Sequence, residues 1–163
     1  MHPERVEPGP GQESVWDYPR PPALEPAGAV LRVEFDRTVI ATSDQALRIC
    51  ETSQPPAYYF PPADVRTELL VEVAGNTFCE WKGLATYFDV VVDGRHVEQA
   101  AWTYRSPSNR YRAITDHLAF YAQKLDCFVD DEQVVPNDGS FYGGWVTSKV
   151  VGPFKGAPGT LGW

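Results

Sequence analysis

Proline and glycine limit what this chain can fold into more than any other feature of its sequence. The 163 residues include 15 prolines and 13 glycines, and both residue types interrupt α-helices. A fold built from long helices is therefore excluded. Residues 63–106 contain no proline at all, and because central strands do not tolerate proline, we expect the sheet to lie in this part of the chain.

Short apolar and β-branched segments predict a mainly β fold. Five of them are expected to form strands: 30–36, 38–41, 67–73, 77–81 and 85–92. Asp93-Gly94 is a typical two-residue hairpin turn, and it predicts that the chain returns as a strand over 95–104. The expected architecture is one compact domain, a twisted sheet or partly open barrel with one or two short helices.

Two other segments carry helical signals. Ser43 can serve as the N-cap of one or two helical turns over 44–49. Farther along, apolar residues recur at helical spacing from Ile114 to Leu125, although residues 117–122 would suit a strand equally well. For this region we expect a short helix followed by extended chain.

The two ends of the chain have their own character. Residues 1–12 are expected to form a flexible tail, and residues 13–28 a proline-stiffened arm whose Trp16 and Tyr18 can pack back across the domain. The last 25 residues predict an extended segment anchored by aromatic rings: Phe141, Tyr142, Trp145, Phe154 and Trp163. We therefore expect a single β-rich domain over residues 13–163.

The net charge argues against a nucleic-acid partner. Lys and Arg total 14 against 22 Asp and Glu, so the formal net charge is −8 and the isoelectric point is near 4.8. Such a surface repels phosphate backbones unless one face is locally basic. The sequence has no stretch of 18 apolar residues and no signal-peptide core near its N-terminus. We expect a cytoplasmic protein that binds neither nucleic acid nor membrane.

The cysteines and histidines give no sign of a metal or redox site. Cys50, Cys79 and Cys127 are far apart, and an odd number of cysteines without a secretory signal is typical of reduced, buried thiols. Cys79 would need a nearby cation to act as a nucleophile, so we expect it to be inert. The three histidines lack the spacing of metal ligands. No cofactor is predicted.

Residues 50–60 and 78–87 combine polar and aromatic side chains. The first segment carries Glu51, Thr52, Tyr58 and Tyr59, and the second carries Glu80, Trp81, Lys82 and Tyr87. If residues 77–81 form a strand, Glu80 and Lys82 lie on the same face. Such a pair can bind a polar ligand or take part in acid–base chemistry, or it can be a surface ion pair worth about 0–1 kcal/mol.

Trp102 and Tyr104 alternate on one face of the expected strand over 95–104. The wall of a pocket and a plain core layer would show the same pattern. The sequence alone therefore leaves both interpretations of these two rings open.

These residues together predict a small-molecule pocket, because aromatic walls with few polar groups are typical of ligand sites. The expected ligand-binding residues are Thr52, Tyr58, Tyr59, Trp81, Tyr87, Trp102 and Tyr104. The alternative is a metal-independent enzyme with Glu80 or Glu51 as general base and Lys82 as stabiliser of negative charge. A further alternative is a protein-interaction module that uses Trp16 and Trp163, and a homodimer is compatible with all three.

Longer motifs, taken together, resemble a known family. They are ESVWDYPRPP (13–22), ETSQPPAYYFPPADV (51–65), CEWKGLATYF (79–88), AWTYRSP (101–107), LAFYAQKLD (118–126) and FYGGWVTSKVVGPFKGAPGTLGW (141–163). In these motifs the chain is similar to the family called domain of unknown function 427, which also carries a nucleotidyltransferase-like label. The resemblance implies a compact, mostly β, cytoplasmic domain of the β-tent type, and it implies no established activity.

The nucleotidyltransferase label finds no support in the residues themselves. That chemistry needs closely spaced carboxylates, introduced by a Gly-Ser turn, that hold two Mg²⁺ ions. Here Gly139-Ser140 leads into Phe-Tyr-Gly-Gly. The chain also departs from the family inside the candidate pocket: Glu80 stands where many members have proline, and Gln54 stands where they favour histidine.

Overall fold

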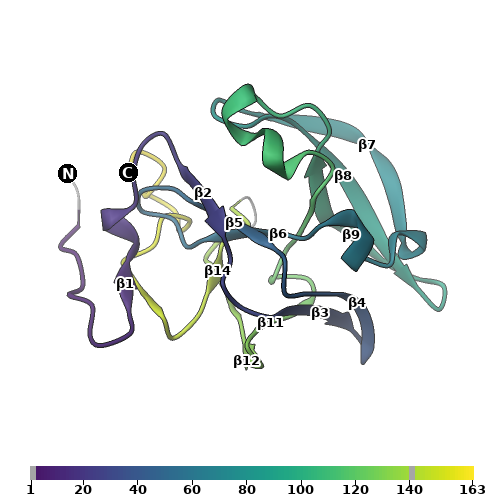
Figure 1. Cartoon of the computed structure of the whole chain (residues 1–163), viewed down its shortest axis with the longest axis horizontal. Helices are drawn as coiled ribbons and strands as arrows, with labels where there is room; N and C mark the ends of the chain where they lie inside the picture. Colours follow the sequence, from purple (N-terminus) through teal and green to yellow (C-terminus); the bar gives the residue numbers. More distant parts are fainter. Residues whose placement is uncertain (1–2, 140–141) are drawn as a thin grey trace.

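Two four-stranded antiparallel sheets form the centre of the computed structural model, which describes residues 3–139 and 142–163 (Figure 1). The first sheet has the order β10-β9-β8-β7, with strands Leu118–Phe120, Arg95–Tyr104, Gly83–Val92 and Leu70–Cys79. The second has the order β12-β11-β3-β4, with strands Glu132–Gln133, Asp126–Val129, Leu31–Phe35 and Thr38–Ser43.

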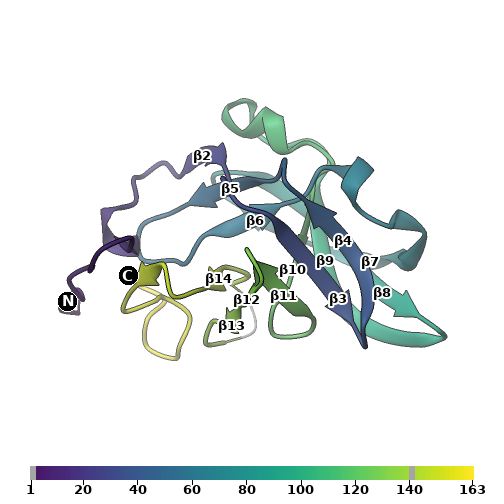
Figure 2. The ribbon, with the colours of Figure 1, turned by 60° about the horizontal axis from the view of Figure 1, so that its bottom comes forward.

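The main hydrophobic core lies between these two sheets. Val33 and Ile40 from the second sheet share one buried cluster with Val90 and Phe120 from the first, and all four are fully buried. Figure 2 shows β3 and β4 crossing over the long strands of the first sheet. Period-two alternation places these apolar side chains on the inner face of each sheet.

A third sheet brings the segment around Tyr59 next to the first sheet. Its order is β2-β5-β6, with strands Ala23–Pro26, Leu47–Cys50 and Ala57–Tyr59. A backbone bridge between Phe60 and Leu118 joins this sheet to β10. Two smaller pairs complete the strands: the parallel pair β1 (Glu13–Ser14) with β15 (Val150–Val151), and the antiparallel pair β13 (Val135–Pro136) with β14 (Trp145–Val146).

The structure confirms the mainly β fold and the predicted central hairpin. Asp93 and Gly94 have φ values of 49° and 77°, as a tight hairpin turn requires, and β9 covers residues 95–104 as expected. No sheet in the described ranges closes into a barrel. The β-tent assignment is finer than this description and stays a prediction.

The two strands predicted over 67–73 and 77–81 are one strand, β7. Its N-terminal end is preceded by the 3-10 helix η3 (Thr67–Leu69). The pairing of β7 with β8 shifts between Glu72 and Asn76, where Gly75 has a φ of 102°. A bulge of this kind interrupts the alternation, which explains why the sequence shows two separate segments.

The helix predicted over 44–49 is wrong. The Ser43 hydroxyl does accept a hydrogen bond from the Gln45 N–H at 3.0 Å, but the chain then extends as β5. Leu47 pairs with Tyr59 on one side, and the neighbouring strand β2 closes the other side. Backbone pairing on both edges of β5 outweighs the local capping signal.

The helical spacing from Ile114 to Leu125 does not reflect a helix either. The 3-10 helix η4 (Asn109–Ile114) ends where that pattern begins, and β10 follows as extended chain. The order of a short helix and then extended chain is as predicted, but the apolar residues belong to the strand, because β10 pairs with Ala101–Thr103 of β9. The remaining 3-10 helices are η1 (Val15–Asp17) and η2 (Pro62–Asp64).

The arm and the C-terminal segment contact each other at one end of the molecule, where Figure 1 shows both chain ends. The rings of Trp16 and Trp163 have centroids 5.6 Å apart, and the Trp16 indole N–H donates to the Pro153 carbonyl at 2.8 Å. Ser140 and Phe141 lie outside the described residues. The boundary between a tail over 1–12 and a domain over 13–163 stays a prediction. Within the described ranges, no helix is long and apolar enough to cross a membrane.

Candidate functional site

A cavity of about 230 Å³ is lined by the first sheet, the third sheet and the C-terminal segment. Eight of the ten predicted site residues line it: Glu51, Tyr59, Glu80, Trp81, Lys82, Tyr87, Trp102 and Tyr104. They come from segments far apart in the sequence, so the fold brings together what the sequence shows only as separate clusters.

Glu80, Trp81 and Lys82 reach the cavity because they form the turn between β7 and β8. Cys79 pairs with Gly83 across the turn, and Gly83 has a φ of 104°, which favours glycine. The predicted strand over 77–81 therefore ends at Cys79, and the expectation that Glu80 and Lys82 share one strand face is wrong. The Lys82 carbonyl accepts a hydrogen bond from the Ser108 N–H at 3.1 Å, which holds the turn against the next loop.

Tyr59, Trp102 and Tyr104 are at once cavity wall and core. Their rings contact one another, with centroids 6.4 Å apart for Tyr59 and Trp102 and 6.3 Å apart for Tyr59 and Tyr104. They belong to a second buried cluster that also contains Ile49 and Ile114. Trp102 and Tyr104 therefore belong to a core layer and line the cavity as well, and their part in a binding site stays a prediction.

The Tyr59 hydroxyl is the most unusual polar group beside the cavity. Tyr59 is 0% exposed, and among the described residues its hydroxyl has no partner at hydrogen-bond distance. Burial raises the pKa of Tyr59, and a weak hydrogen-bonding interaction with the Trp102 side chain opposes this rise. A buried hydroxyl without a close partner costs about 1–3 kcal/mol, so Tyr59 is placed behind the wall at a cost in stability.

The Tyr59 hydroxyl lies close to residues that line the cavity. Cys79, Glu51 and Tyr87 act electrostatically on its pKa, and all three line the cavity. The hydroxyl itself has no accessible surface, so it is buried behind the cavity wall. Tyr87 is itself held in place, since its hydroxyl lies 2.6 Å from that of Thr77.

Two lysines among the described residues line the cavity, and each lies near a tyrosine face. Lys82 Nζ is 5.7 Å from the ring centroid of Tyr104, and Lys155 Nζ is 5.2 Å from that of Tyr142. Neither lysine has a carboxylate partner within 4.0 Å in the part of the chain that the structure describes. The lining also contains the carboxylates of Glu51 and Glu80, so its lysines and carboxylates balance in number without forming ion pairs in the described ranges.

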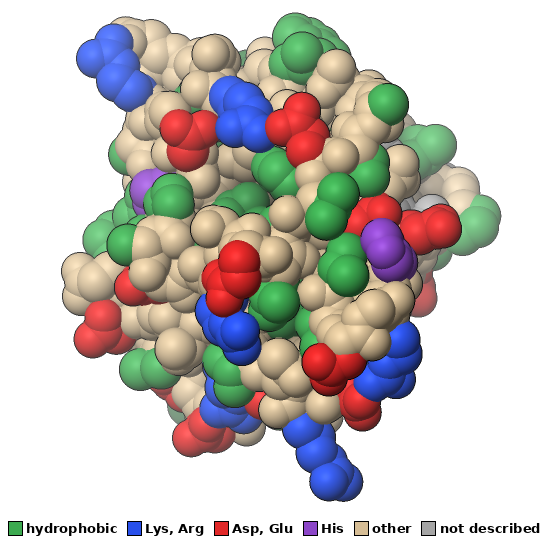
Figure 3. Space-filling view, turned by 90° about the vertical axis from the view of Figure 1, so that its right-hand side faces the viewer, with side chains coloured by type: hydrophobic (Ala, Val, Ile, Leu, Met, Phe, Trp, Pro, Cys, Tyr) green, Lys and Arg blue, Asp and Glu red, His purple; other side chains and the backbone are tan. Residues whose placement is uncertain are grey.

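Several charged side chains outside the cavity form ion pairs. Acidic and basic side chains are interspersed on the face shown in Figure 3. Arg66 pairs with Glu68 at 3.1 Å, and Arg105 pairs with Glu72. The unpaired lysines at the cavity therefore differ from these arginines.

The two carboxylates of the cavity have different surroundings. Glu51 accepts a hydrogen bond from the Gln54 side-chain amide at 2.8 Å and is half-buried, whereas Glu80 is exposed on the turn. Glu80 and Lys82 form no ion pair within the described ranges. Glu51 is therefore the better positioned of the two candidate bases.

Several residues of the cavity were missed from the sequence. They include Thr77, Tyr121, Tyr142, Gly143, Gly144 and Lys155. The Gly-Gly pair was the one available signal, because adjacent glycines permit close backbone contact. A Cβ at Gly144 would lie 2.3 Å from the Pro55 carbonyl oxygen, so only glycine fits where the C-terminal segment meets the loop between β5 and β6.

Tyr58 and Thr52 do not line the cavity. Tyr58 and Tyr59 are neighbours on β6, and neighbouring residues on a strand point to opposite faces. The two side chains therefore cannot both line the same cavity wall. The Tyr58 ring instead packs on Trp145, with centroids 5.1 Å apart. Thr52 donates its hydroxyl proton to the Tyr18 carbonyl at 2.5 Å.

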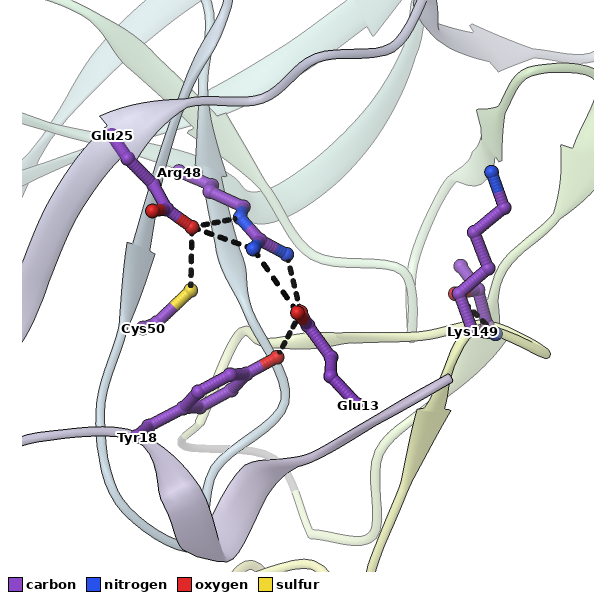
Figure 4. Close-up of polar contacts among 7 residues, drawn as sticks. Glu13, Tyr18, Glu25, Arg48, Cys50 and Lys149 are labelled. Carbon is purple, nitrogen blue, oxygen red and sulfur yellow. Dashed lines mark hydrogen bonds and ion pairs between the residues drawn. The ribbon is translucent and has the colours of Figure 1, made fainter. Parts of the chain in front are cut away.

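A second polar cluster is centred on Arg48 (Figure 4), and Arg48 and Tyr58 line the same small cavity. Arg48 Nη1 lies 2.6 Å from Glu13 Oε1, and Arg48 Nε donates to Glu25 Oε1 at 2.7 Å. The Tyr18 hydroxyl also donates to Glu13, at 2.6 Å. Burial alone would raise the pKa of Glu13, but the hydrogen bonds from Arg48 and Tyr18 lower it. Because both carboxylates are already paired with Arg48, we interpret this cluster as structural: its ion pairs hold the arm (residues 13–28) against β5. Glu13, Tyr18, Glu25 and Arg48 are called the Arg48 clasp below.

Within the described ranges, no group of three or more His, Cys, Asp or Glu side chains is placed to hold a metal ion. A sequence model of one family, described as a domain of unknown function (DUF427), matches residues 23–131. No curated protein matches the chain. The matched segment contains Tyr59 and the β7–β8 turn, but it ends before Tyr142 and Lys155.

Proposed function

Because this chain belongs to the family called domain of unknown function 427, whose description names no activity, we propose a function from the cavity itself: it binds a small molecule. The observation that carries this proposal is the convergence of eight predicted residues on one cavity. Mostly aromatic walls with a few polar groups are typical of ligand sites.

The size of the cavity limits the size of the ligand. Pockets for drug-sized ligands enclose roughly 300–1,000 Å³, and this cavity encloses about 230 Å³. The ligand we expect therefore has the size of a single substituted ring.

A fragment screen with a cavity-filling variant tests the proposal. Ala57 lines the cavity, so Ala57→Met would fill part of it. We expect wild-type protein to bind fragments that raise its melting temperature and change its tryptophan fluorescence, since Trp81 and Trp102 line the site. Ala57→Met should lose this binding. The matched control is Ala74→Met, because Ala74 is exposed on β7 and lies outside the cavity lining.

Two results would contradict the proposal. One is a broad fragment library, with cations, anions and neutral molecules, from which nothing binds to the wild-type protein. The other is binding that is unchanged in Ala57→Met.

A metal-independent enzyme is the second candidate function, and it uses the same cavity. The observation in its favour is that Gln54 holds the Glu51 carboxylate beside the cavity, as a general base requires. Lys82 would stabilise developing negative charge, and Glu80 is the alternative base. Once a turned-over compound is found, Glu51→Gln and Lys82→Met should each abolish turnover with little change in melting temperature. Full activity in both variants would exclude these roles.

The interaction-module alternative has less support. Trp16 and Trp163 contact each other, so these two rings cover part of the surface that a partner would use. Homodimer formation and a cytoplasmic location remain predictions of the sequence.

A further inference from the structure

One edge of the first sheet is open. Strand β7 (Leu70–Cys79) comes last in the order β10-β9-β8-β7 and pairs with β8 on one side, and Figure 1 shows it at the outer margin of the sheet. On its other side, its backbone N–H and C=O groups meet no backbone partner in the described ranges. Such a row of unpaired groups is a template for pairing with a further strand.

The other edges of the two large sheets are covered or short. At the opposite edge of the first sheet, Leu118 of β10 bridges to Phe60. At one edge of the second sheet, Ala41 of β4 bridges to Val65, and β12 at the other edge has two residues. β7 has ten residues. Among the described strands of these sheets, it is therefore the long edge that the chain itself leaves unpaired.

β7 also lacks the residues that usually protect an edge strand. Lysine and proline at an edge oppose pairing with another chain, and residues 70–79 contain neither. Glu72 is the one charged residue of the strand, and its carboxylate is paired with Arg105. The bulge between Glu72 and Asn76 interrupts the strand, so the regular stretches that can accept a further strand are 70–72 and 76–79.

Apolar side chains next to this edge are exposed. Phe78 is 74% exposed, the highest value among the large hydrophobic side chains of the described residues, and Leu84 is 53% exposed. The two residues are direct cross-strand partners on β7 and β8, so their side chains lie together on one face of the sheet. A strand that pairs with β7 would bring its own side chains beside this apolar pair and reduce its contact with water.

We propose that β7 is a dimer interface, in which the β7 strands of two copies of this chain pair antiparallel and join their first sheets into one continuous sheet. An antiparallel pair of identical edges is self-complementary about a twofold axis. Because the pairing uses the open edge of both copies, the assembly ends at two. The site of this inference is the sheet edge, and it does not depend on the proposed function.

The charge distribution favours a second copy at this edge. The chain has a net charge of −8, so two copies repel each other wherever acidic surfaces meet. On β7, however, Glu72 has Arg105 beside it, and residues 76–79 carry no charge. The turn that follows contains both Glu80 and Lys82. Two copies can therefore approach along β7 without bringing unpaired like charges on the strand together.

Sedimentation velocity on the full chain, without ligand, tests the proposal. Concentrations from about 1 μM to about 1 mM cover dissociation constants across the same range, and we expect wild-type protein to shift from monomer to dimer within it. Phe78→Lys and Leu84→Lys should each weaken the dimer by about 10-fold or more, because each places a charge beside the edge. Both side chains are exposed, so the melting temperature should change little.

Leu161→Lys is the matched control. Leu161 is 69% exposed and lies near the C-terminus, which Figure 1 shows on the other side of the molecule from β7. The substitution adds the same charge and removes an apolar side chain of similar exposure, and it should keep the wild-type dissociation constant. Phe78 also lines the cavity, so these variants are compared by mass and not by ligand binding.

Hydrogen exchange distinguishes strand pairing from contact through side chains alone. Backbone amides of residues 70–79 should exchange more slowly at a concentration where the dimer dominates than at one where the monomer does, because pairing protects amides at the edge. Amides of the arm (residues 13–28) should exchange at the same rate at both concentrations.

Four results would overturn the proposal. They are wild-type protein that stays monomeric up to about 1 mM, assembly that continues beyond two copies, a dimer that is as stable in Phe78→Lys and Leu84→Lys as in wild type, and a dimer whose protected amides lie outside β7. None of these results bears on small-molecule binding, which the fragment screen decides separately.

Discussion

The backbone of Gly143 lies against the indole ring of Trp102: a Cβ at Gly143 would come within 2.1 Å of Trp102 Cη2. Contacts under 3.0 Å are essentially never seen for a Cβ atom, so Gly143→Ala must displace either the ring or the C-terminal segment. We expect the free energy of unfolding to fall by about 1–3 kcal/mol, as for overpacked cores, and ligand binding to weaken. Urea unfolding measures the first effect.

Gly162→Ala is the control for this substitution. A Cβ at Gly162 would have no atom within 4 Å, so its free energy of unfolding should stay within about 0.5 kcal/mol of wild type. Equal stability of Gly143→Ala and Gly162→Ala would show that the C-terminal segment does not pack on Trp102 as described.

Tyr59 and Tyr111 form a natural pair for testing the unpartnered hydroxyl. Both rings are buried, but the Tyr111 hydroxyl donates to the Pro22 carbonyl at 2.8 Å. Without ligand, Tyr59→Phe should raise the free energy of unfolding by about 1 kcal/mol because it removes a buried group without a partner, whereas Tyr111→Phe should lower it by about 1 kcal/mol. A loss of stability in Tyr59→Phe similar to that in Tyr111→Phe would mean that the Tyr59 hydroxyl has a partner.

The Arg48 clasp makes stability depend on pH. The pKa of the Glu13 carboxyl is lower in the folded protein than the 4.5 of an unfolded chain, so its ionised form stabilises the fold above pH 4.5. This contribution is lost as the pH falls through the folded-state value. We expect Glu13→Gln to be less stable than wild type at neutral pH, with the difference shrinking as the pH is lowered below 4.5.

Urea unfolding of wild type and Glu13→Gln at several pH values measures this difference. Glu98→Gln is the control, because Glu98 is exposed and its side chain has no ion pair or hydrogen bond in the described ranges, so its difference from wild type should not vary with pH in this window. A stability difference for Glu13→Gln that is constant from neutral pH to below pH 4.5 would contradict the role of the ionised carboxylate.

The three cysteines should differ in reactivity. Burial raises the pKa of Cys50 to about 12 and also raises that of Cys127, and both thiols are almost completely buried. Cys79 is half-buried and lines the cavity. Iodoacetamide should therefore modify Cys79 first in the native protein, and a bound ligand should slow this reaction. Peptide mass mapping, with Cys79→Ser as the control, identifies the site, and equally fast modification of Cys50 would contradict the burial described here.

Local patterns predicted the part of the fold that depends on neighbouring residues. The Asp93-Gly94 turn and the strand over 95–104 follow from turn chemistry and alternation, and both are confirmed. The segment 44–49 shows the limit of such patterns: Ser43 makes a local cap-like hydrogen bond, but pairing of β5 with strands from residues 23–26 and 57–59 decides the structure. That pairing joins segments that no local pattern connects.

The candidate site could be predicted as a set of residue types but not as a geometry. Glu51 and Lys82 stood out because polar and aromatic residues cluster around them, and both line the cavity. Tyr58 was predicted together with Tyr59 because two adjacent tyrosines look alike in the sequence, but a strand places them on opposite faces, and of the two only Tyr59 lines the cavity. Lys155 was missed because long-range contacts, such as the backbone hydrogen bond from Lys155 to Ser53, bring it to the cavity, and such contacts leave no local signal.

The cavity wall formed by the C-terminal segment has a consequence for how this family can diversify. The family match ends at residue 131. It therefore covers Tyr59 and all strands of the two large sheets except β12, whereas Tyr142 and Lys155 come from the segment beyond it. Two proteins can therefore share the matched region and still have different side chains at the cavity positions of Tyr142 and Lys155. Under the proposed function, exchange of Tyr142 or Lys155 would alter which molecule the cavity recognises without changing any residue of the matched region.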